Sequence, residues 1–264
     1  WYTKQGLVIS DVQEITEEDK SSKQQPRKAR QQLKIDRQPQ KAEEDISNIV
    51  VCIAPHPDDE TLGCGGTLLR HKAMGDEVHW LIMTTLDENN ERKNERAQEI
   101  KDVAKAFAFD SFHQCDFITS QLDTVPLNEL ISEVTNFFQK IKPTTIYLPF
   151  AGDIHTDHRM VFDTVLSSTK SFRHPYIKNM RCYETLSETE FNIDPEVEAF
   201  KPNLWINISD YLEEKIKIMN IYEEEMGRPP FPRSGKTLRA LAQFRGSTSN
   251  FNNAEAFLVL KELI

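Results

Sequence analysis

Hydrophobic positions between residues 48 and 172 follow two patterns that alternate along the chain. Short continuous runs rich in β-branched residues are typical of buried strands, and longer segments with apolar residues at every third or fourth position are typical of amphipathic helices. The runs predict strands at residues 48–56, 77–85, 112–117 and 144–150, and helices at residues 63–76, 94–110, 126–143 and 158–172. This alternation predicts a parallel sheet that is covered by helices on both faces.

The first 47 residues lack this pattern. They are polar and rich in Gln, they have almost no large apolar residue after Ile15, and nearly every charge between Lys20 and Lys41 is basic. Such a segment cannot bury enough apolar surface to offset the entropy lost on ordering. We therefore divide the chain into a polar N-terminal arm or linker, residues 1–47, and an α/β domain, residues 48–264.

Composition narrows the class of protein further. The 264 residues are 38% hydrophobic, enough for a substantial core, and carry a formal net charge of −10. That charge argues against non-specific binding to nucleic acid or anionic membranes. No apolar stretch approaches the roughly 20 residues of a membrane span. The N-terminal residues lack the pattern of a signal peptide, and the four scattered cysteines form no CxxC pair. We expect a cytoplasmic protein, and we leave open a homo-oligomer.

Two polar clusters follow two of the predicted strands. The first runs from His56 to Glu60, directly after the first strand, and the second is GDIHTDHR, residues 152–159. Because ligands of parallel α/β sheets bind beyond the carboxyl ends of the strands, these distant segments are expected to meet at one edge of the sheet.

The spacing within both clusters favours a metal site. His56 and Asp59 are three residues apart, as are His155 and His158, and on a turn or helix this spacing puts both side chains on one side. A catalytic Zn²⁺ commonly takes three protein ligands and a water. Two ligands from the first cluster and one from the second supply that number. The alternative, in which the acids only cap a helix, leaves a costly cluster of buried charges.

The remaining polar residues of the clusters suit acid–base chemistry. A carboxylate beside the metal can accept a proton from the bound water, whose pKa Zn²⁺ lowers to about 7. A second histidine can donate a hydrogen bond to a developing oxyanion or protonate a leaving amine. The chemistry that this arrangement implies is hydrolysis of an amide or an ester.

The sequence resembles the LmbE-like or PIG-L-like de-N-acetylases. The resemblance rests on APHPDDE, residues 54–60, and HTDH, residues 155–158, and it continues in the C-terminal segments 202–225 and 239–262. It covers roughly residues 48–264. It implies a Rossmann-like α/β fold, a three-layer sandwich with a mostly parallel sheet. It also implies a mostly zinc-dependent activity that removes acetyl from molecules containing N-acetylglucosamine or cleaves related amides.

Matching by motif position, the resemblance also implies roles for individual residues. Asp58 would be the general base, and His155 would stabilise the oxyanion or act as the acid. Asp157 would orient a histidine, and Arg96, a better match than Arg92, would contact the sugar. The implied metal ligands are His56, Asp59 and His158. Zn²⁺ is the expected ion, although another divalent transition metal such as Fe²⁺ or Co²⁺ also suits such a site.

Three further segments carry weaker expectations. The resemblance implies a helix at Ala-Glu-Ala-Phe, residues 254–257. The glycines of GCGGT, residues 63–67, are interpreted as letting the backbone turn close to the metal. The Pro-rich basic segment 226–241 is interpreted as a solvated surface loop. The alternative is a lid or substrate loop in which Arg228, Arg233 and Lys236 face an anionic group.

These observations favour a zinc hydrolase that removes the N-acetyl group from an N-acetylglucosamine-type amino sugar or its conjugate. A close rival is an amidase that cleaves a larger acyl group from a glycan or a thiol conjugate. Two other classes stay open: a Rossmann-like protein that binds a sugar without turnover, and an interaction module that works through the N-terminal arm. The expected partner is a small amino sugar or glycoconjugate.

Overall fold

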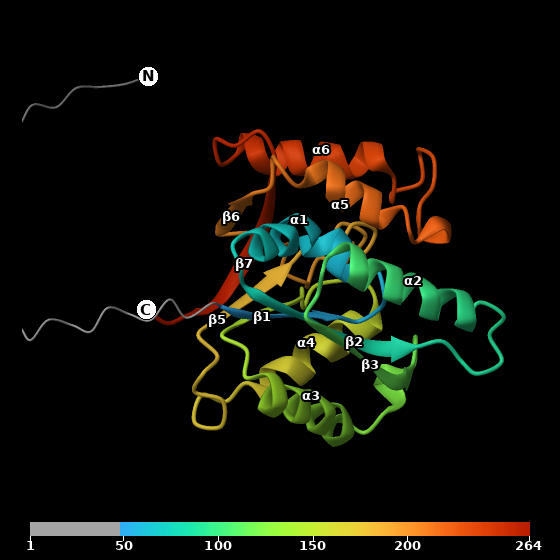
Figure 1. Ribbon diagram of the computed structural model, residues 1–264, viewed down its shortest axis with the longest axis vertical. Coiled ribbons are helices and arrows are strands. Elements are labelled where there is room, and N and C mark those ends of the chain that lie inside the picture. The colour runs from blue at the N-terminus through green and yellow to red at the C-terminus, as the bar shows by residue number, and fades with distance from the viewer. Residues whose placement is uncertain (1–47) are drawn as a thin grey trace, which may run out of the picture. The chain divides into compact units, whose positions relative to one another are not determined.

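The computed structural model describes residues 48–264, which form a seven-stranded sheet with helices on both faces (Figure 1). The predicted arm of residues 1–47 lies outside the described residues. The elements are β1 (Ile49–Ala54), α1 (Asp59–Ala73), β2 (Glu77–Thr85), α2 (Lys93–Ala106), β3 (Ser111–Ile118), η1 (Leu122–Thr124), α3 (Leu127–Ile141), β4 (Thr145–Pro149), α4 (Thr156–Ser168), β5 (Asn179–Tyr183), β6 (Leu204–Asn207), α5 (Leu212–Met219), η2 (Glu223–Glu225), α6 (Gly235–Ser247) and β7 (Ala254–Glu262).

The order of the strands creates a switch point in the middle of the sheet. The order is β3-β2-β1-β4-β5-β7-β6, and the first five of these strands are parallel. From β1 the chain moves outward to β2 and β3, and it then returns to β4 on the other side of β1. The loops after β1 and β4 therefore diverge to opposite faces, which leaves a crevice between them at the carboxyl edge. Both polar clusters of the sequence lie in these two loops and in the first turns of the helices that follow, α1 and α4.

The helices form two layers. In Figure 1, α1, α2, α5 and α6 lie on one side of the sheet, and α3 and α4 lie on the other. Each side has its own core of buried side chains. Residues 50–54 of β1 are fully buried because both faces of this central strand are covered, which accounts for its continuous apolar sequence. The predicted α/β sandwich with a mostly parallel sheet is confirmed.

The segment expected to be a closing helix is a strand, so that expectation was wrong. Residues Ala254–Glu262 form β7, which is antiparallel to both β5 and β6. Alternate residues of β7 point to one face: the Glu255 carboxylate accepts hydrogen bonds from the backbone N–H groups of Gly66 and Thr67 in α1, and Phe257 packs against Tyr147. This period of two fits a strand between two partners better than a helix.

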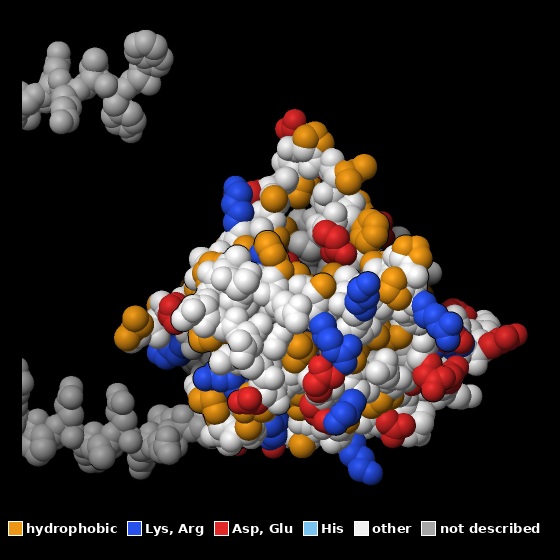
Figure 2. Space-filling model, turned by 90° about the horizontal axis from the view of Figure 1, so that it is seen from above, with side chains coloured by type: hydrophobic (Ala, Val, Ile, Leu, Met, Phe, Trp, Pro, Cys, Tyr) orange, Lys and Arg blue, Asp and Glu red, His pale blue; other side chains and the backbone are white. Residues whose placement is uncertain are grey.

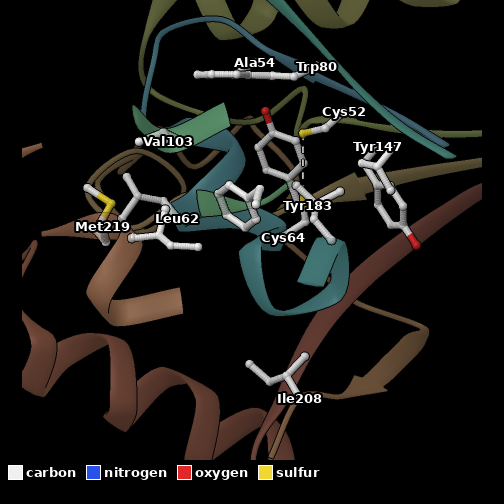
Figure 3. Close-up of a cluster of buried hydrophobic side chains, with 14 of the residues drawn as sticks. Cys52, Ala54, Leu62, Cys64, Trp80, Val103, Tyr147, Tyr183, Ile208 and Met219 are labelled. Atoms are coloured by element: carbon white, nitrogen blue, oxygen red, sulfur yellow. Dashed lines mark hydrogen bonds between the residues drawn. The ribbon is translucent and has the colours of Figure 1, made fainter. Parts of the chain in front are cut away.

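The glycines of GCGGT lie inside α1, and they serve close packing there. A Cβ on Gly63 would lie 2.1 Å from the ring of Tyr183, and one on Gly66 would lie 2.8 Å from Ile208. Figure 3 shows this buried cluster, in which Cys64 of α1 also contacts Cys52 of β1 with a sulfur–sulfur distance of 3.4 Å. These contacts hold α1, whose first turn carries the acidic residues of the site, close against the sheet.

Replacing Gly63 by Ala is expected to lower the free energy of unfolding by about 1–3 kcal/mol, because the core must shift to accept the methyl group. Tyr183 cannot move freely, since it is fully buried and its hydroxyl donates to the carbonyl oxygen of Ile53 at 2.8 Å. Urea unfolding measures the change. The matched control is Gly235→Ala in α6, whose Cβ would meet the mobile end of Arg239 at 3.3 Å. Equal unfolding midpoints for the two variants would contradict this packing.

Candidate metal centre and active-site cavity

The two polar clusters meet at the carboxyl edge of β1 and β4. After β1, residues 55–58 form a turn, and Asp59 opens α1. After β4, a short loop leads to His155, which caps the N-terminus of α4 by accepting a hydrogen bond from the backbone N–H of Asp157 at 3.1 Å. The ring centroids of His56 and His158 lie 5.4 Å apart. The predicted convergence of segments about 100 residues apart in the sequence is therefore present.

Three of the predicted ligands converge in space. The carboxylate oxygen Oδ2 of Asp59 lies 3.4 Å from Nδ1 of His56 and 3.3 Å from Nε2 of His158. Oδ1 of Asp59 and Nε2 of His158 are buried and have no hydrogen-bond partner. Buried polar atoms without partners are costly, and a divalent cation would satisfy both. The donor set of two imidazoles and one carboxylate thus fits a catalytic Zn²⁺ site with an open fourth position.

Each of the two histidines is oriented by a carboxylate on its far nitrogen. Nε2 of His56 lies 3.0 Å from Oδ2 of Asp157, and Nδ1 of His158 lies 2.8 Å from Oδ2 of Asp153. Such partners fix the tautomer and ring orientation of histidine ligands. Asp157 was expected to orient a histidine, and its neighbour is His56. Asp153 was not among the residues predicted from the sequence. The one feature of the sequence that could have indicated it is its position in the second polar cluster, residues 152–159.

A second trio shares the same edge. His56, His155 and Asp157 also lie close enough to hold a metal ion. However, both oxygens of Asp157 already accept backbone N–H groups, from Ser120 at 2.6 Å and from Leu122 at 3.2 Å, and Nδ1 of His155 accepts one as well. The first trio is the better candidate, because its unpartnered atoms are free to bind.

The carboxylates strongly affect the two histidines. Burial opposes the charged form of His56, yet the hydrogen bonds that the carboxylates of Asp157 and Asp59 accept from it outweigh burial and raise its pKa to about 9. Burial likewise opposes charge on His158, and Asp59 and Asp153 raise its pKa to about 10. Although burial favours the neutral acid, the two histidines hold the pKa of Asp59 well below its usual range. The centre thus stabilises positive charge, as a cation site must.

Asp58 occupies a strained position next to this centre. Its backbone φ is 126°, a region that non-glycine residues rarely adopt and that costs free energy unless neighbouring groups hold it. Two groups do so here: the Glu60 carboxylate accepts the N–H of Asp58 at 3.1 Å, and Nη1 of Arg233 donates to Oδ2 of Asp58 at 2.7 Å. Burial raises the pKa of the Asp58 carboxyl well above its usual range, and the charge of Arg233 opposes that rise.

A cavity of about 210 Å³ opens in front of Asp58. Its wall combines two arginines with acidic residues, and both His56 and His155 reach it. The lining residues are His56, Pro57, Asp58, Thr84, Thr85, Leu86, Arg96, Gln114, Thr119, His155, Glu188, Glu225 and Arg233. Arg96, which the resemblance implied would contact the sugar, lines the cavity, and its guanidinium donates to the carbonyl oxygen of Pro57 at 3.3 Å and to Glu225 at 2.5 Å.

Three further lining residues were not among the site residues expected from the sequence. Glu188 follows β5, Glu225 ends η2, and Arg233 lies in the segment that was interpreted as a solvated surface loop. That interpretation was wrong for Arg233, whose side chain is only 16% exposed and points at Asp58. The minor alternative of a substrate loop had named this residue.

The fold and the site together define an α/β protein with a candidate metal centre at its switch point. Residues 51–169 match the family profile described as PIG-L, GlcNAc-PI de-N-acetylase, which agrees with the PIG-L-like resemblance that the sequence showed. This match and the deacetylase relatives together imply an enzyme of the hydrolase class.

Individual relatives share both sequence and fold. The diacetylchitobiose deacetylase of Thermococcus kodakarensis is 26% identical over 219 residues, which cover 78% of this chain and 80% of the relative. Among solved structures, a conserved protein of Thermus thermophilus has a TM-score of 0.67 at 21% identity, covering 82% of this chain and 96% of its own. The N,N'-diacetylchitobiose deacetylase of Pyrococcus horikoshii has a TM-score of 0.64 at 22% identity, covering 80% and 83%. At these identities the structural matches establish the fold.

Two features of the described residues relate to the expectations on nucleic acid and on membranes. On the face shown in Figure 2, Lys and Arg side chains lie among Asp and Glu side chains. None of the helices between residues 48 and 264 combines the length and apolar character needed to cross a membrane.

Proposed function

We propose that this protein is a Zn²⁺-dependent hydrolase that removes the N-acetyl group from an N-acetylglucosamine-type amino sugar or its conjugate. The observation that carries the proposal is the pair of unpartnered ligand atoms on Asp59 and His158, buried beside Asp58 at the edge of a cavity. The match of residues 51–169 to a de-N-acetylase family profile supports the same reaction class. The cytoplasmic location, a homo-oligomer and the domain boundary at residue 47 stay predictions from the sequence.

His56, Asp59 and His158 would hold the ion. When bound there, it would supply Lewis-acid chemistry: it polarises a carbonyl oxygen and lowers the pKa of water. The protein's own contribution is the fixed geometry of the ligands. Asp157 and Asp153 hold the two imidazoles from behind, at 3.0 Å and 2.8 Å.

Asp58 is placed to accept the proton of the attacking water. Its Oδ2 is engaged by Arg233, whereas within residues 48–264 no hydrogen bond reaches its Oδ1. One oxygen is therefore anchored and the other is available to the cavity. A carboxylate held in this way can take the proton in the first step and pass it on in the second, as general acid–base catalysis requires.

His155 is suited to donate a hydrogen bond to the oxyanion or a proton to the leaving amine. Because its Nδ1 accepts the backbone N–H of Asp157, the neutral ring carries its proton on Nε2. Burial and the nearby charges of His56 and His158 lower the pKa of His155 to about 4, which favours that neutral tautomer. A neutral donor is well matched to negative charge that develops on the carbonyl oxygen.

The cavity suggests the size of the group that is recognised. Its volume of about 210 Å³ is below the roughly 300–1,000 Å³ of sites for drug-sized ligands, so it suits a single N-acetylated sugar ring with any aglycone lying outside. Charged groups such as Glu188 and Arg96 offer hydrogen bonds to hydroxyl groups. Both named deacetylase relatives, which act on diacetylchitobiose by their names, support an amino-sugar substrate.

Acetate release tests the proposal directly. The zinc-loaded full-length protein is incubated with N-acetylglucosamine, N,N'-diacetylchitobiose, glycoside and lipid conjugates of N-acetylglucosamine, and matched N-butanoyl and N-octanoyl analogues. We expect acetate from at least one acetyl substrate and slower cleavage of its longer acyl analogues. Faster cleavage of the long acyl analogues would favour the amidase instead. No release from any substrate would contradict a hydrolase of either kind.

Loading the metal-free protein with Zn²⁺ is expected to release protons. The pKa values of His56 and His158, about 9 and about 10, lie above neutrality, so both rings are charged in the metal-free protein and must lose a proton to act as ligands. Zinc affinity should therefore rise as the pH increases from about 6 to about 9. Calorimetric titration in two buffers of different ionisation enthalpy measures the proton count. An affinity that is independent of pH would contradict this ligand set.

A further inference from the structure

Arg233 is held rigidly by four acceptors. Its Nε donates to Oγ of Ser187 at 2.7 Å, its Nη2 donates to Glu188 at 3.2 Å, and its Nη1 donates to Glu225 at 3.0 Å and to Asp58 at 2.7 Å. The planar fork of a guanidinium suits such simultaneous contacts, which a lysine could not reproduce. A side chain held at four points has a fixed orientation. Because Arg233 lies at the cavity wall, it can fix the orientation of the site residues that it contacts.

Asp58 needs such a support. Its backbone has the strained φ of 126°, and its carboxylate lies among the acidic side chains of Asp59, Glu60 and Glu225, all of which act on its charge. Repulsion from these acids would turn an unrestrained carboxylate away. Among residues 48–264, Arg233 is the one side chain that donates a hydrogen bond to the Asp58 carboxylate.

The other arginine of the cavity has a different target. Arg96 donates to the carbonyl oxygen of Pro57 and to Glu225, and it also pairs with Glu99. Arg96 therefore holds the turn before Asp58, and it holds Glu225, which also accepts a hydrogen bond from Arg233. It makes no hydrogen bond to the Asp58 carboxylate. The two arginines are linked through Glu225, and only Arg233 can set the direction of the base.

We propose that Arg233 is a positioning residue for the hydrolytic reaction: by holding Oδ2 of Asp58, it directs Oδ1 toward the attacking water. This inference rests on the proposed function. The segment 226–234, which lies outside both sequence motifs, is then part of the active site. Arg233 acts there on Asp58 and not by direct contact with the sugar.

Kinetics of Arg233 variants test this role. In zinc-loaded full-length Arg233→Ala, kcat should fall about 10²-fold, because misplacing a catalytic group by about 1 Å has an effect of that size. KM should stay within about threefold of the parent, since the effect is on the transition state. Arg233→Lys should recover part of kcat, because an ammonium can still reach Oδ2. Arg228→Ala, in the same segment but exposed, is the matched control and should behave like the parent.

A double variant separates positioning from general structural damage. If Arg233 acts through Asp58, adding Arg233→Ala to Asp58→Asn should cause little further loss of kcat, because the group to be positioned is already disabled. Equal losses in both backgrounds would overturn the proposal, as would a change confined to KM. Should Arg233→Ala fold poorly, the same cycle is run with Arg233→Lys.

A structural readout keeps the inference independent of turnover. Crystal structures of the zinc-loaded parent and of Arg233→Lys or Arg233→Ala are compared at Asp58. We expect the hydrogen bond between Arg233 and Asp58 to persist in the parent and the carboxylate to rotate in the Ala variant. A parent in which Arg233 points away from Asp58, or an Arg233→Ala variant in which Asp58 is unmoved, would overturn the inference even if the protein proved to have no deacetylase activity.

Discussion

Replacing Asp58 by Asn is expected to remove most turnover while leaving zinc bound. The amide has the shape of the carboxylate but cannot accept the proton, and loss of a general acid–base group typically costs 10²–10⁴-fold in rate. The ligands His56, Asp59 and His158 are untouched, so zinc content per chain should equal that of the parent. Steady-state kinetics and elemental analysis of the same preparation measure both quantities.

The matched control for this variant is Asp163→Asn, which makes the same chemical change at an exposed position of α4. It should leave kcat unchanged. Parent-like activity of Asp58→Asn would show that another group takes the proton. Loss of zinc from that variant would mean instead that Asp58 belongs to the ligand set.

Replacing His158 by Ala is expected to abolish tight zinc binding, and activity with it. His158 supplies a buried nitrogen that has no other partner, and its loss also leaves Asp153 facing an empty space. Loss of an orienting partner alone costs about 10–100-fold in metal affinity, so loss of the ligand should cost more. Competition with a chelator of known affinity measures the change.

The control for the ligand variant is His79→Asn. His79 bonds to Ser111 at the far end of the sheet strands, away from the metal centre, and zinc affinity should not change. Unaltered zinc affinity in His158→Ala would break the proposed ligand set, whereas a matched loss in both variants would indicate general unfolding.

The central part of the site was predictable because strand ends locate it. His56 and Asp59 follow β1 directly, and His158 follows β4 after a short loop, so a parallel sheet leaves these residues no place other than its carboxyl edge. Their spacing of three residues then brings the side chains together. Local sequence and fold class thus point to the same arrangement.

The supporting part of the site could not be predicted in the same way. Ser187, Glu188 and Arg233 lie in irregular segments, whose positions depend on tertiary packing and not on hydrophobic period. Arg233 reaches Asp58 across 175 positions of sequence, and nothing in its basic, Pro-rich surroundings distinguishes it from a solvated arginine. The sequence named Arg233 only in the alternative of a lid or substrate loop, and it gave no indication of a contact with Asp58.

The errors have physical causes as well. The segment Ala254–Glu262 lacks the strong β-branched character of β1, and its alternation becomes visible only when β5 and β6 flank it. The glycines at positions 63 and 66 were interpreted as letting the backbone turn close to the metal, since glycine weakens helices. In the structure, tight packing against Tyr183 and Ile208 outweighs that local preference.

An anomalous-scattering map recorded at the zinc edge on crystals of the zinc-loaded protein tests the central claim most directly. The account predicts one strong peak within coordination distance of Asp59, Nδ1 of His56 and Nε2 of His158, with Asp58 beside it and not bound to it. A map with no peak there, or with its main peak at the separate trio of His113, Cys115 and Glu133 on β3 and α3, would contradict the account.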